Sequence, residues 1–112
     1  MSQSNQDLVR RRHAVVARGV GQFAGDTTAR SASGSHLVDV EGREFIDFAG
    51  GIGVMNVGHC DPQVVAAIQD QAAQLLHASF HVATYEPYVA LCEKLVSILP
   101  HGGPTTAMLV NS

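Results

Sequence analysis

The chain has 112 residues, of which 46% are apolar and 15% are charged, so it holds about one domain of sequence and is too apolar for a disordered or coiled-coil protein. Seven basic residues against ten acidic ones give a net charge of −3, which argues against nucleic acid or an anionic membrane as a partner. The two cysteines form neither a disulfide framework nor a zinc pattern, and the N-terminus lacks the apolar core of a signal peptide. A cytoplasmic protein is therefore expected.

The N-terminal part is predicted to be weakly ordered until a β-hairpin begins. Residues 7–18 favour a short helix, and residues 19–35 contain glycines with little periodicity, which indicates an irregular surface segment. Residues 36–40 and 44–48 are β-branched and aromatic runs separated by a short segment around Gly42. This spacing predicts a β-hairpin whose glycine supplies the positive φ of a tight turn.

Two helices and a buried strand are predicted for the rest of the chain. Asp61, followed by a proline, is a good N-cap for a helix that runs to about His77. A second helix is predicted from residues 84–87 to Leu99. Residues 105–110 form an apolar run that is typical of a strand buried on both faces of a parallel sheet, and such a strand needs neighbouring strands and covering helices. The chain is therefore expected to be the opening of a larger α/β protein.

Residues 50–53 read Gly-Gly-Ile-Gly and allow two interpretations. Backbone N–H groups without side chains can cradle a phosphate. However, the segment lacks the Gly-Lys-Ser/Thr ending of a nucleotide-binding loop and the spacing of a dinucleotide fingerprint. The favoured interpretation is a close backbone approach after a strand.

The other chemistry-bearing residues are interpreted as structural. His59, Cys60 and Asp61 are adjacent, but no second cluster supplies the convergent ligands that zinc needs, so no metal site is predicted. His59 is interpreted as an approach residue ahead of the helix and Cys60 as a small buried apolar residue, although a Cys–His nucleophile pair stays open. Lys94, the single lysine, is predicted to lie at the surface of its helix, and no catalytic residue is assigned.

Three stretches together resemble one enzyme family. They are residues 40–52 (VEGREFIDFAGGI), residues 56–59 (NVGH) with the Asp-Pro pair that follows, and residues 85–88 (YEPY) with 91–93 (LCE). In composite they resemble the N-terminal part of class III pyridoxal-phosphate-dependent aminotransferases. The likeness is strongest to the 4-aminobutyrate branch of that family, which also carries an Arg-Gly-Val-Gly-Gln segment like residues 18–22.

This resemblance implies the fold class: an α/β, fold type I architecture of which the chain is an incomplete N-terminal segment. It implies an N-terminal arm over residues 1–18, and an irregular segment with the β-hairpin of the small domain over 19–58. Two helices over 59–104 then lead to the truncated first strand of the large cofactor-binding domain over 105–112. The phosphate-binding turn and the lysine that binds the cofactor are expected beyond the end of the chain.

The resemblance also implies site residues and partners. Ile52 matches a position that lines the substrate pocket, and His81 falls where relatives carry a polar residue near the active-site mouth. Ser112 precedes the phosphate-binding glycine and is expected to contact the cofactor, pyridoxal phosphate. The N-terminal arm and hairpin are expected at a homodimer interface.

Two functional hypotheses follow. In the first, the chain is part of an aminotransferase that moves an amino group from 4-aminobutyrate or a similar ω-amino acid to 2-oxoglutarate, while ornithine, acetylornithine, diaminobutyrate and β-alanine stay possible donors. In the second, it is a catalytically inactive truncated product that acts, if at all, by docking on an intact subunit. In both, the 112-residue chain alone is expected to be inactive.

Overall fold

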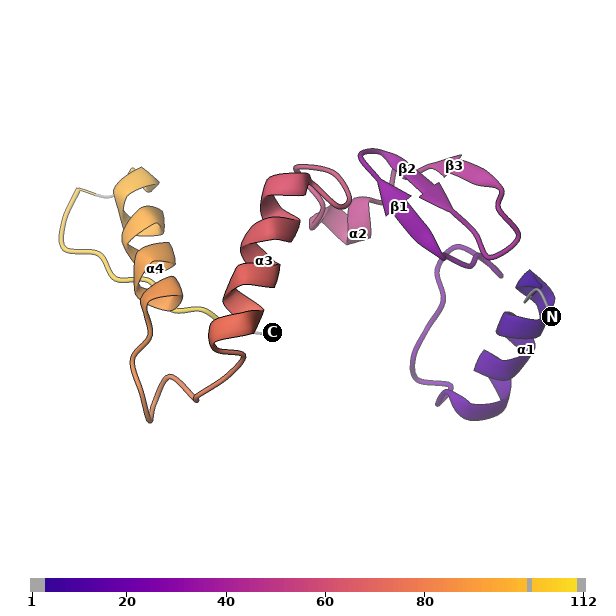
Figure 1. Cartoon of the computed structure of the whole chain (residues 1–112), viewed down its shortest axis with the longest axis horizontal. Coiled ribbons are helices and arrows are strands. Elements are labelled where there is room, and N and C mark those ends of the chain that lie inside the picture. The colour runs from indigo at the N-terminus through magenta and orange to yellow at the C-terminus, as the bar shows by residue number, and fades with distance from the viewer. Residues whose placement is uncertain (1–3, 101, 111–112) are drawn as a thin grey trace. The chain divides into compact units, whose positions relative to one another are not determined.

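A computed structural model describes residues 4–100 and 102–110, and the chain divides into two compact units, Met1–Asp70 and Gln71–Ser112. The first unit holds α1 (Asn5–Val15), three strands, the short helix α2 (Gly50–Gly53) and most of α3 (Pro62–Gln74). The second holds the end of α3 and all of α4 (Glu86–Ile98), as labelled in Figure 1. Each unit is described by itself.

The predicted N-terminal helix is present, but it begins at Asn5 and ends at Val15. Ser4 is its N-cap, and the Oγ atom of this serine accepts a hydrogen bond from the backbone N–H of Asp7 at 3.0 Å. This bond satisfies one of the N–H groups that the first helical turn leaves free. An acidic residue in the first turn and basic residues in the last turn also suit the helix dipole.

A three-stranded antiparallel sheet in the order β1-β2-β3 follows. The prediction of an irregular segment over residues 19–35 is wrong for β1 (Ser31–Ser33), which pairs with β2 (His36–Val38) across a two-residue turn. Pairing orders a Ser/Ala run that has little strand propensity of its own. Gly34 in that turn has a φ of +54°, which glycine adopts without steric cost. The Cα partners are Ser31 with Val38, Ala32 with Leu37 and Ser33 with His36, then His36 with Ile46, Leu37 with Phe45 and Val38 with Glu44.

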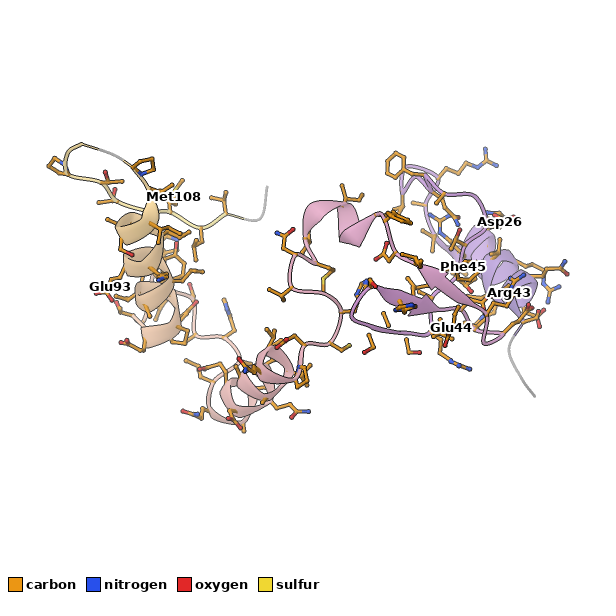
Figure 2. All side chains as sticks on the ribbon, turned by 90° about the horizontal axis from the view of Figure 1, so that it is seen from above. Asp26, Arg43, Glu44, Phe45, Glu93 and Met108 are labelled. Carbon is orange, nitrogen blue, oxygen red and sulfur yellow. The ribbon has the colours of Figure 1, made fainter. Side chains whose placement is uncertain are left out.

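The predicted hairpin is confirmed between β2 and β3 (Glu44–Ile46), with shorter strands and a longer turn than predicted. Asp39 ends β2 because its Oδ1 atom accepts hydrogen bonds from the backbone N–H groups of Glu41 and Arg43, both at 2.9 Å. Gly42 supplies the predicted positive φ, at +89°. The guanidinium carbon of Arg43 lies 6.0 Å from the centre of the Phe45 ring, and Figure 2 labels both residues.

Helix α3 starts as predicted. Oδ1 of Asp61 accepts the backbone N–H groups of the first turn at 2.9 and 3.1 Å, which confirms this residue as the N-cap. The helix ends at Gln74, before the predicted end at about His77. The side-chain amide of Gln71 donates to the Leu75 carbonyl at 3.0 Å, and this bond satisfies a carbonyl that the last helical turn leaves free.

The second unit confirms the helix predicted up to Leu99 as α4. The strand predicted over residues 105–110 needs neighbouring strands, so it stays a prediction. Among the described residues nothing pairs with this segment in a ladder. Side chains of α4 bond it instead, since Leu109 donates its backbone N–H to Tyr88 Oη at 3.1 Å and Cys92 Sγ donates to the Ala107 carbonyl at 3.7 Å. Half-buried and exposed residues alternate along the segment, which is the periodicity of a strand. Figure 2 labels Met108 on this segment and Glu93 on α4.

Much apolar surface is exposed in both units. Val9, at 9% exposed, is the buried apolar residue within the described ranges, whereas Phe23 and Phe48 are each 93% exposed. None of the helices described here is both long enough and apolar enough to cross a membrane. Exposed apolar area of this extent is typical of a chain that packs against further protein.

Candidate substrate-facing site

The Gly-Gly-Ile-Gly segment forms a single left-handed helical turn, α2. The φ angles of its four residues are +52°, +61°, +60° and +79°. The turn is closed by hydrogen bonds from the N–H of Ile52 to the Ala49 carbonyl at 2.8 Å and from the N–H of Val54 to the Gly50 carbonyl at 2.9 Å. Glycine adopts positive φ without a steric penalty, which explains why three of the four residues are glycines.

Ile52 is the residue for which this turn is unfavourable. A β-branched side chain at a φ of +60° is a steric outlier, and a left-handed conformation costs a residue with a Cβ atom about 1–2 kcal/mol. The Ile52 side chain is 81% exposed, so burial within this chain does not offset the strain. Strained residues of this kind cluster at functional sites, and the exposed isoleucine is therefore the candidate substrate contact.

Asp47 holds the start of the turn. One oxygen of its carboxylate, Oδ1, accepts the backbone N–H groups of Ala49 at 2.9 Å and Gly50 at 3.0 Å. The other, Oδ2, lies 2.6 Å from Nε2 of His59, and the imidazole is the donor because a carboxylate only accepts. The hydrogen bond from His59 is the main reason that the pKa of Asp47 lies below its ordinary value.

Sequence reasoning missed this pair. His59 precedes α3 as expected, but it also bonds Asp47, which lies 12 positions earlier in the chain. Only the fold brings such residues together. The available signal was a charged residue late in an apolar strand run, three positions before a glycine cluster.

The backbone of His59 is bound to the turn between β1 and β2. Its N–H donates to the Gly34 carbonyl at 2.8 Å, and its carbonyl accepts the Gly34 N–H at 2.9 Å. Gly58 makes this approach possible, because a Cβ atom added there would lie 3.1 Å from Gly34 Cα and 3.2 Å from Gly34 O. The close backbone approach predicted at residues 50–53 therefore occurs at Gly58 instead.

Replacing Gly58 by alanine is expected to destabilise the protein by about 1–3 kcal/mol, because the residue has a φ of +86° and faces backbone that cannot move aside. Chemical denaturation of the full-length protein that carries this chain measures the change. Gly19→Ala is the matched control, since an added Cβ at Gly19 meets nothing within 4 Å. Equal stability of the two variants would contradict the assignment of Gly58 as a contact glycine.

A second polar cluster joins α1 to the hairpin. Asp39 is 1% exposed, and its Oδ2 accepts hydrogen bonds from Asn5 Nδ2 at 2.9 Å and Arg43 Nε at 2.7 Å. Asn5 accepts a bond from Thr28 Oγ1 and donates its backbone N–H to Glu41 Oε1 at 2.9 Å. Burial by itself raises the pKa of Asp39, but the hydrogen bonds, that from Asn5 first, hold the pKa well below its ordinary value. The cluster is a structural anchor between α1 and the hairpin.

The sequence-predicted site residues fall in different parts of the chain. Ile52 belongs to the first compact unit and His81 to the second, and Ser112 lies outside the described residues. His81 is exposed in a turn closed by hydrogen bonds from the N–H groups of Val82 and Ala83 to the Ser79 carbonyl, at 2.8 and 3.1 Å.

An aromatic cluster holds the turn that carries His81. Phe80 stacks on Tyr88 with ring centres 4.0 Å apart and meets Tyr85 edge-on at 5.2 Å.

Lys94 is exposed on α4, as predicted. The interpretation of Cys60 as buried is wrong, because it sits at a φ of +53° in the turn ahead of α3 with its side chain exposed.

The described residues do not form a phosphate or metal site by themselves. The N–H groups of Ile52, Gly53 and Val54 are bonded to carbonyls of the same turn, so they are not free to cradle an anion. In the described part of the chain, no group of three or more His, Cys, Asp or Glu residues is placed to hold a metal ion. The turn presents an apolar side chain, which suits contact with the carbon chain of a small substrate.

The known proteins that this chain resembles in sequence and in structure are all aminotransferases among those compared below. The family model described as "Aminotransferase class-III" matches residues 15–112. The 5-aminovalerate aminotransferase DavT of Pseudomonas aeruginosa is 48% identical over 112 residues, which is 100% of this chain and 26% of that protein. The 4-aminobutyrate aminotransferase GabT of Escherichia coli is 44% identical over 109 residues, which is 97% of this chain and 25% of that protein. Among solved structures, an acetylornithine aminotransferase from Elizabethkingia anophelis superimposes with a TM-score of 0.76 at 22% identity, over 87% of this chain and 24% of that chain.

These relatives confirm the predicted fold class, an incomplete α/β segment of a pyridoxal-phosphate-dependent aminotransferase. Pyridoxal phosphate is the cofactor of that family, as predicted for the full-length protein. The chain spans about a quarter of the length of the relatives that it matches. By its match to the family model and its identity with these enzymes, the chain belongs to the class III aminotransferases.

Proposed function

We propose that the full-length protein carrying this chain transfers an amino group from an unbranched ω-amino acid, such as 5-aminovalerate or 4-aminobutyrate, to 2-oxoglutarate. The observation that carries this proposal is the 48% identity with a 5-aminovalerate aminotransferase over the whole chain, together with 44% identity with a 4-aminobutyrate aminotransferase. Both of those donors have an unbranched methylene chain between two charged ends. The strained, exposed Ile52 offers the apolar contact that such a chain needs.

The cofactor and the residues of this chain have different proposed roles in the reaction. Pyridoxal phosphate supplies the electron sink for amino-group transfer. The described residues contribute a substrate face at Ile52, and Ser112 is proposed to meet the cofactor phosphate where the chain continues in its relatives. His81 is proposed as a second, polar contact near the mouth of the site. A homodimer is proposed as the working form, with exposed apolar residues of the first unit as part of its interface.

Initial rates test the proposed function. The full-length protein, loaded with pyridoxal phosphate, is assayed for glutamate formation from 2-oxoglutarate with 5-aminovalerate, 4-aminobutyrate, ornithine and N-acetylornithine as donors. We expect kcat/KM for the better of the first two to exceed that for the other donors by about tenfold or more. Preference for N-acetylornithine or ornithine, or the absence of glutamate with every donor, would overturn the proposal.

The 112-residue chain by itself is expected to show no transaminase activity and no selective covalent adduct with pyridoxal phosphate. Its single lysine, Lys94, is exposed on α4, and an internal aldimine needs a lysine held in a cofactor site. Borohydride reduction after incubation with the cofactor, followed by peptide mapping, checks this. Stoichiometric labelling of Lys94, accompanied by glutamate formation, would show that the chain carries catalytic machinery of its own.

A further inference from the structure

We propose that Asp47 and His59 are positioning residues that hold Ile52 in its left-handed conformation against the amino donor. This inference rests on the proposed function of Ile52 as a substrate contact. Neither residue is proposed to touch the substrate. Both would act on amino transfer only through the turn that carries the isoleucine.

Both oxygens of the Asp47 carboxylate accept hydrogen bonds that fix the turn. Oδ1 binds the N–H groups of Ala49 and Gly50, the two residues that lead into the left-handed turn, and Oδ2 binds His59. The side chains of Asp47 and His59 are only 11% and 18% exposed, so water competes weakly for these bonds. The pair therefore acts as a clamp at the base of the loop formed by residues 48–58.

The backbone fixes both ends of this loop to one place. Asp47 donates its N–H to the Ser35 carbonyl at 2.8 Å, and His59 exchanges two hydrogen bonds with Gly34 at 2.8 and 2.9 Å. Gly34 and Ser35 are the two residues of the turn between β1 and β2. The loop thus begins and ends on the turn between β1 and β2, and it carries Ile52.

The clamp is needed because the left-handed backbone conformation is unfavourable for an isoleucine. A strained backbone conformation persists only when its surroundings determine it, and the side chain of Ile52 has little packing of its own, at 81% exposed. The bonds from Asp47 to the start of the turn are the side-chain contacts that fix it. Loss of the His59 side chain leaves Oδ2 of the Asp47 carboxylate without its partner. The carboxylate that binds the start of the turn is then less fixed, so the isoleucine would sample other positions.

Steady-state kinetics of the full-length holoenzyme test the inference. His59→Ala is expected to raise KM for the amino donor by about tenfold, while His59→Gln, whose side-chain N–H can still reach Asp47, is expected to stay close to the wild-type KM. His36→Ala is the matched control, because His36 is an exposed histidine on β2 of the same unit, and it should leave KM unchanged.

A double-mutant cycle separates positioning from a purely structural role. If the clamp acts through Ile52, then His59→Ala adds little to the loss of kcat/KM already caused by Ile52→Gly. Additive losses, or failure of His59→Gln to keep a near-normal KM, would overturn the inference. If His59→Ala does not fold, His59→Leu, which keeps much of the side-chain volume but has no N–H donor for Asp47, takes its place in the cycle.

Hydrogen exchange provides a readout that does not depend on activity. The amides of Ala49 and Gly50 are expected to exchange about tenfold faster in His59→Ala than in the wild type, while amides of α1 keep their rates. Unchanged exchange at these two amides would overturn the clamp. If instead exchange rises but Ile52→Gly leaves the donor KM unaltered, the clamp stands as a structural device, and both the role of Ile52 in the proposed function and the positioning inference are refuted.

Discussion

Replacing Ile52 by arginine in the full-length protein is expected to raise KM for the amino donor by about tenfold or more, with little loss of stability. The side chain is 81% exposed in this chain, so arginine has room in the fold itself. At the proposed substrate face, however, a long cation would replace the apolar contact with the methylene chain of the donor. The left-handed turn is as unfavourable for arginine as for isoleucine or slightly less so, because arginine is not β-branched.

The measurement pairs donor KM with a thermal melt of the same holoenzyme. Leu76→Arg is the matched control, because Leu76 is also a branched apolar residue and similarly exposed, at 84%, but lies in the second unit after the end of α3. It should leave the donor KM at the wild-type value. If Ile52→Arg melts early and loses cofactor while residual turnover keeps a normal KM, then Ile52 is a packing residue and not a substrate contact.

Replacing Asn5 by aspartate is expected to loosen the first unit more than any other conservative change in α1. Asn5 Nδ2 donates to the buried Asp39 carboxylate, and the backbone N–H of Asn5 binds Glu41. The introduced carboxylate removes a donor and places a like charge against Asp39. Amide exchange at Glu41 and Arg43, whose N–H groups bind Asp39, should accelerate about tenfold or more at neutral pH.

The stability of this variant depends on pH with the opposite sign to that of the wild type. In the wild type the pKa of Asp39 is lowered, so its contribution to stability is complete above the ordinary aspartate value of about 3.9 and is lost as the pH falls through the folded-state pKa. In Asn5→Asp the two carboxylates raise the pKa of their pair, so the variant is weakest at neutral pH and recovers as the pH falls towards about 4–5.

The control for charge alone is Gln6→Glu, at an exposed neighbour in the first turn of the same helix. A carboxylate there suits the helix dipole and should change exchange little. Exchange rates in Asn5→Asp that match those of the control would show that Asp39 is not the partner that matters. The same follows if protection, measured relative to the intrinsic exchange rate at each pH, keeps falling as the pH falls to about 4.5.

Local sequence signals accounted well for the helices. Asp61 followed by proline predicted the start of α3, and its carboxylate indeed binds the first-turn N–H groups. Gly42 predicted the hairpin turn. Strand β1 was missed because its Ser-Ala-Ser run has no apolar alternation. The signal that could have found it is the two-residue turn led by Gly34, which is typical of tight hairpins.

The apolar run at residues 105–110 stays predicted as a strand rather than observed as one. Its composition predicts a buried strand, but a strand forms only where a ladder partner exists, and the described residues offer the side chains of Tyr88 and Cys92 instead. In the site, resemblance alone pointed to Ile52, and no sequence pattern indicated its left-handed conformation. The Asp47–His59 pair depends on the position of Gly34 in the sheet, which sequence spacing does not reveal.

The most direct test of the central claim, that Ile52 is held in strain because it meets the amino donor, is to measure stability and donor kcat/KM together for Ile52→Gly in the full-length holoenzyme. Glycine relieves the left-handed strain, so we predict that the free energy of unfolding rises by about 1 kcal/mol. The same change removes the apolar contact, so kcat/KM for the amino donor should fall by about tenfold. A variant that gains stability and keeps full activity, or that loses stability, would contradict this account of the site.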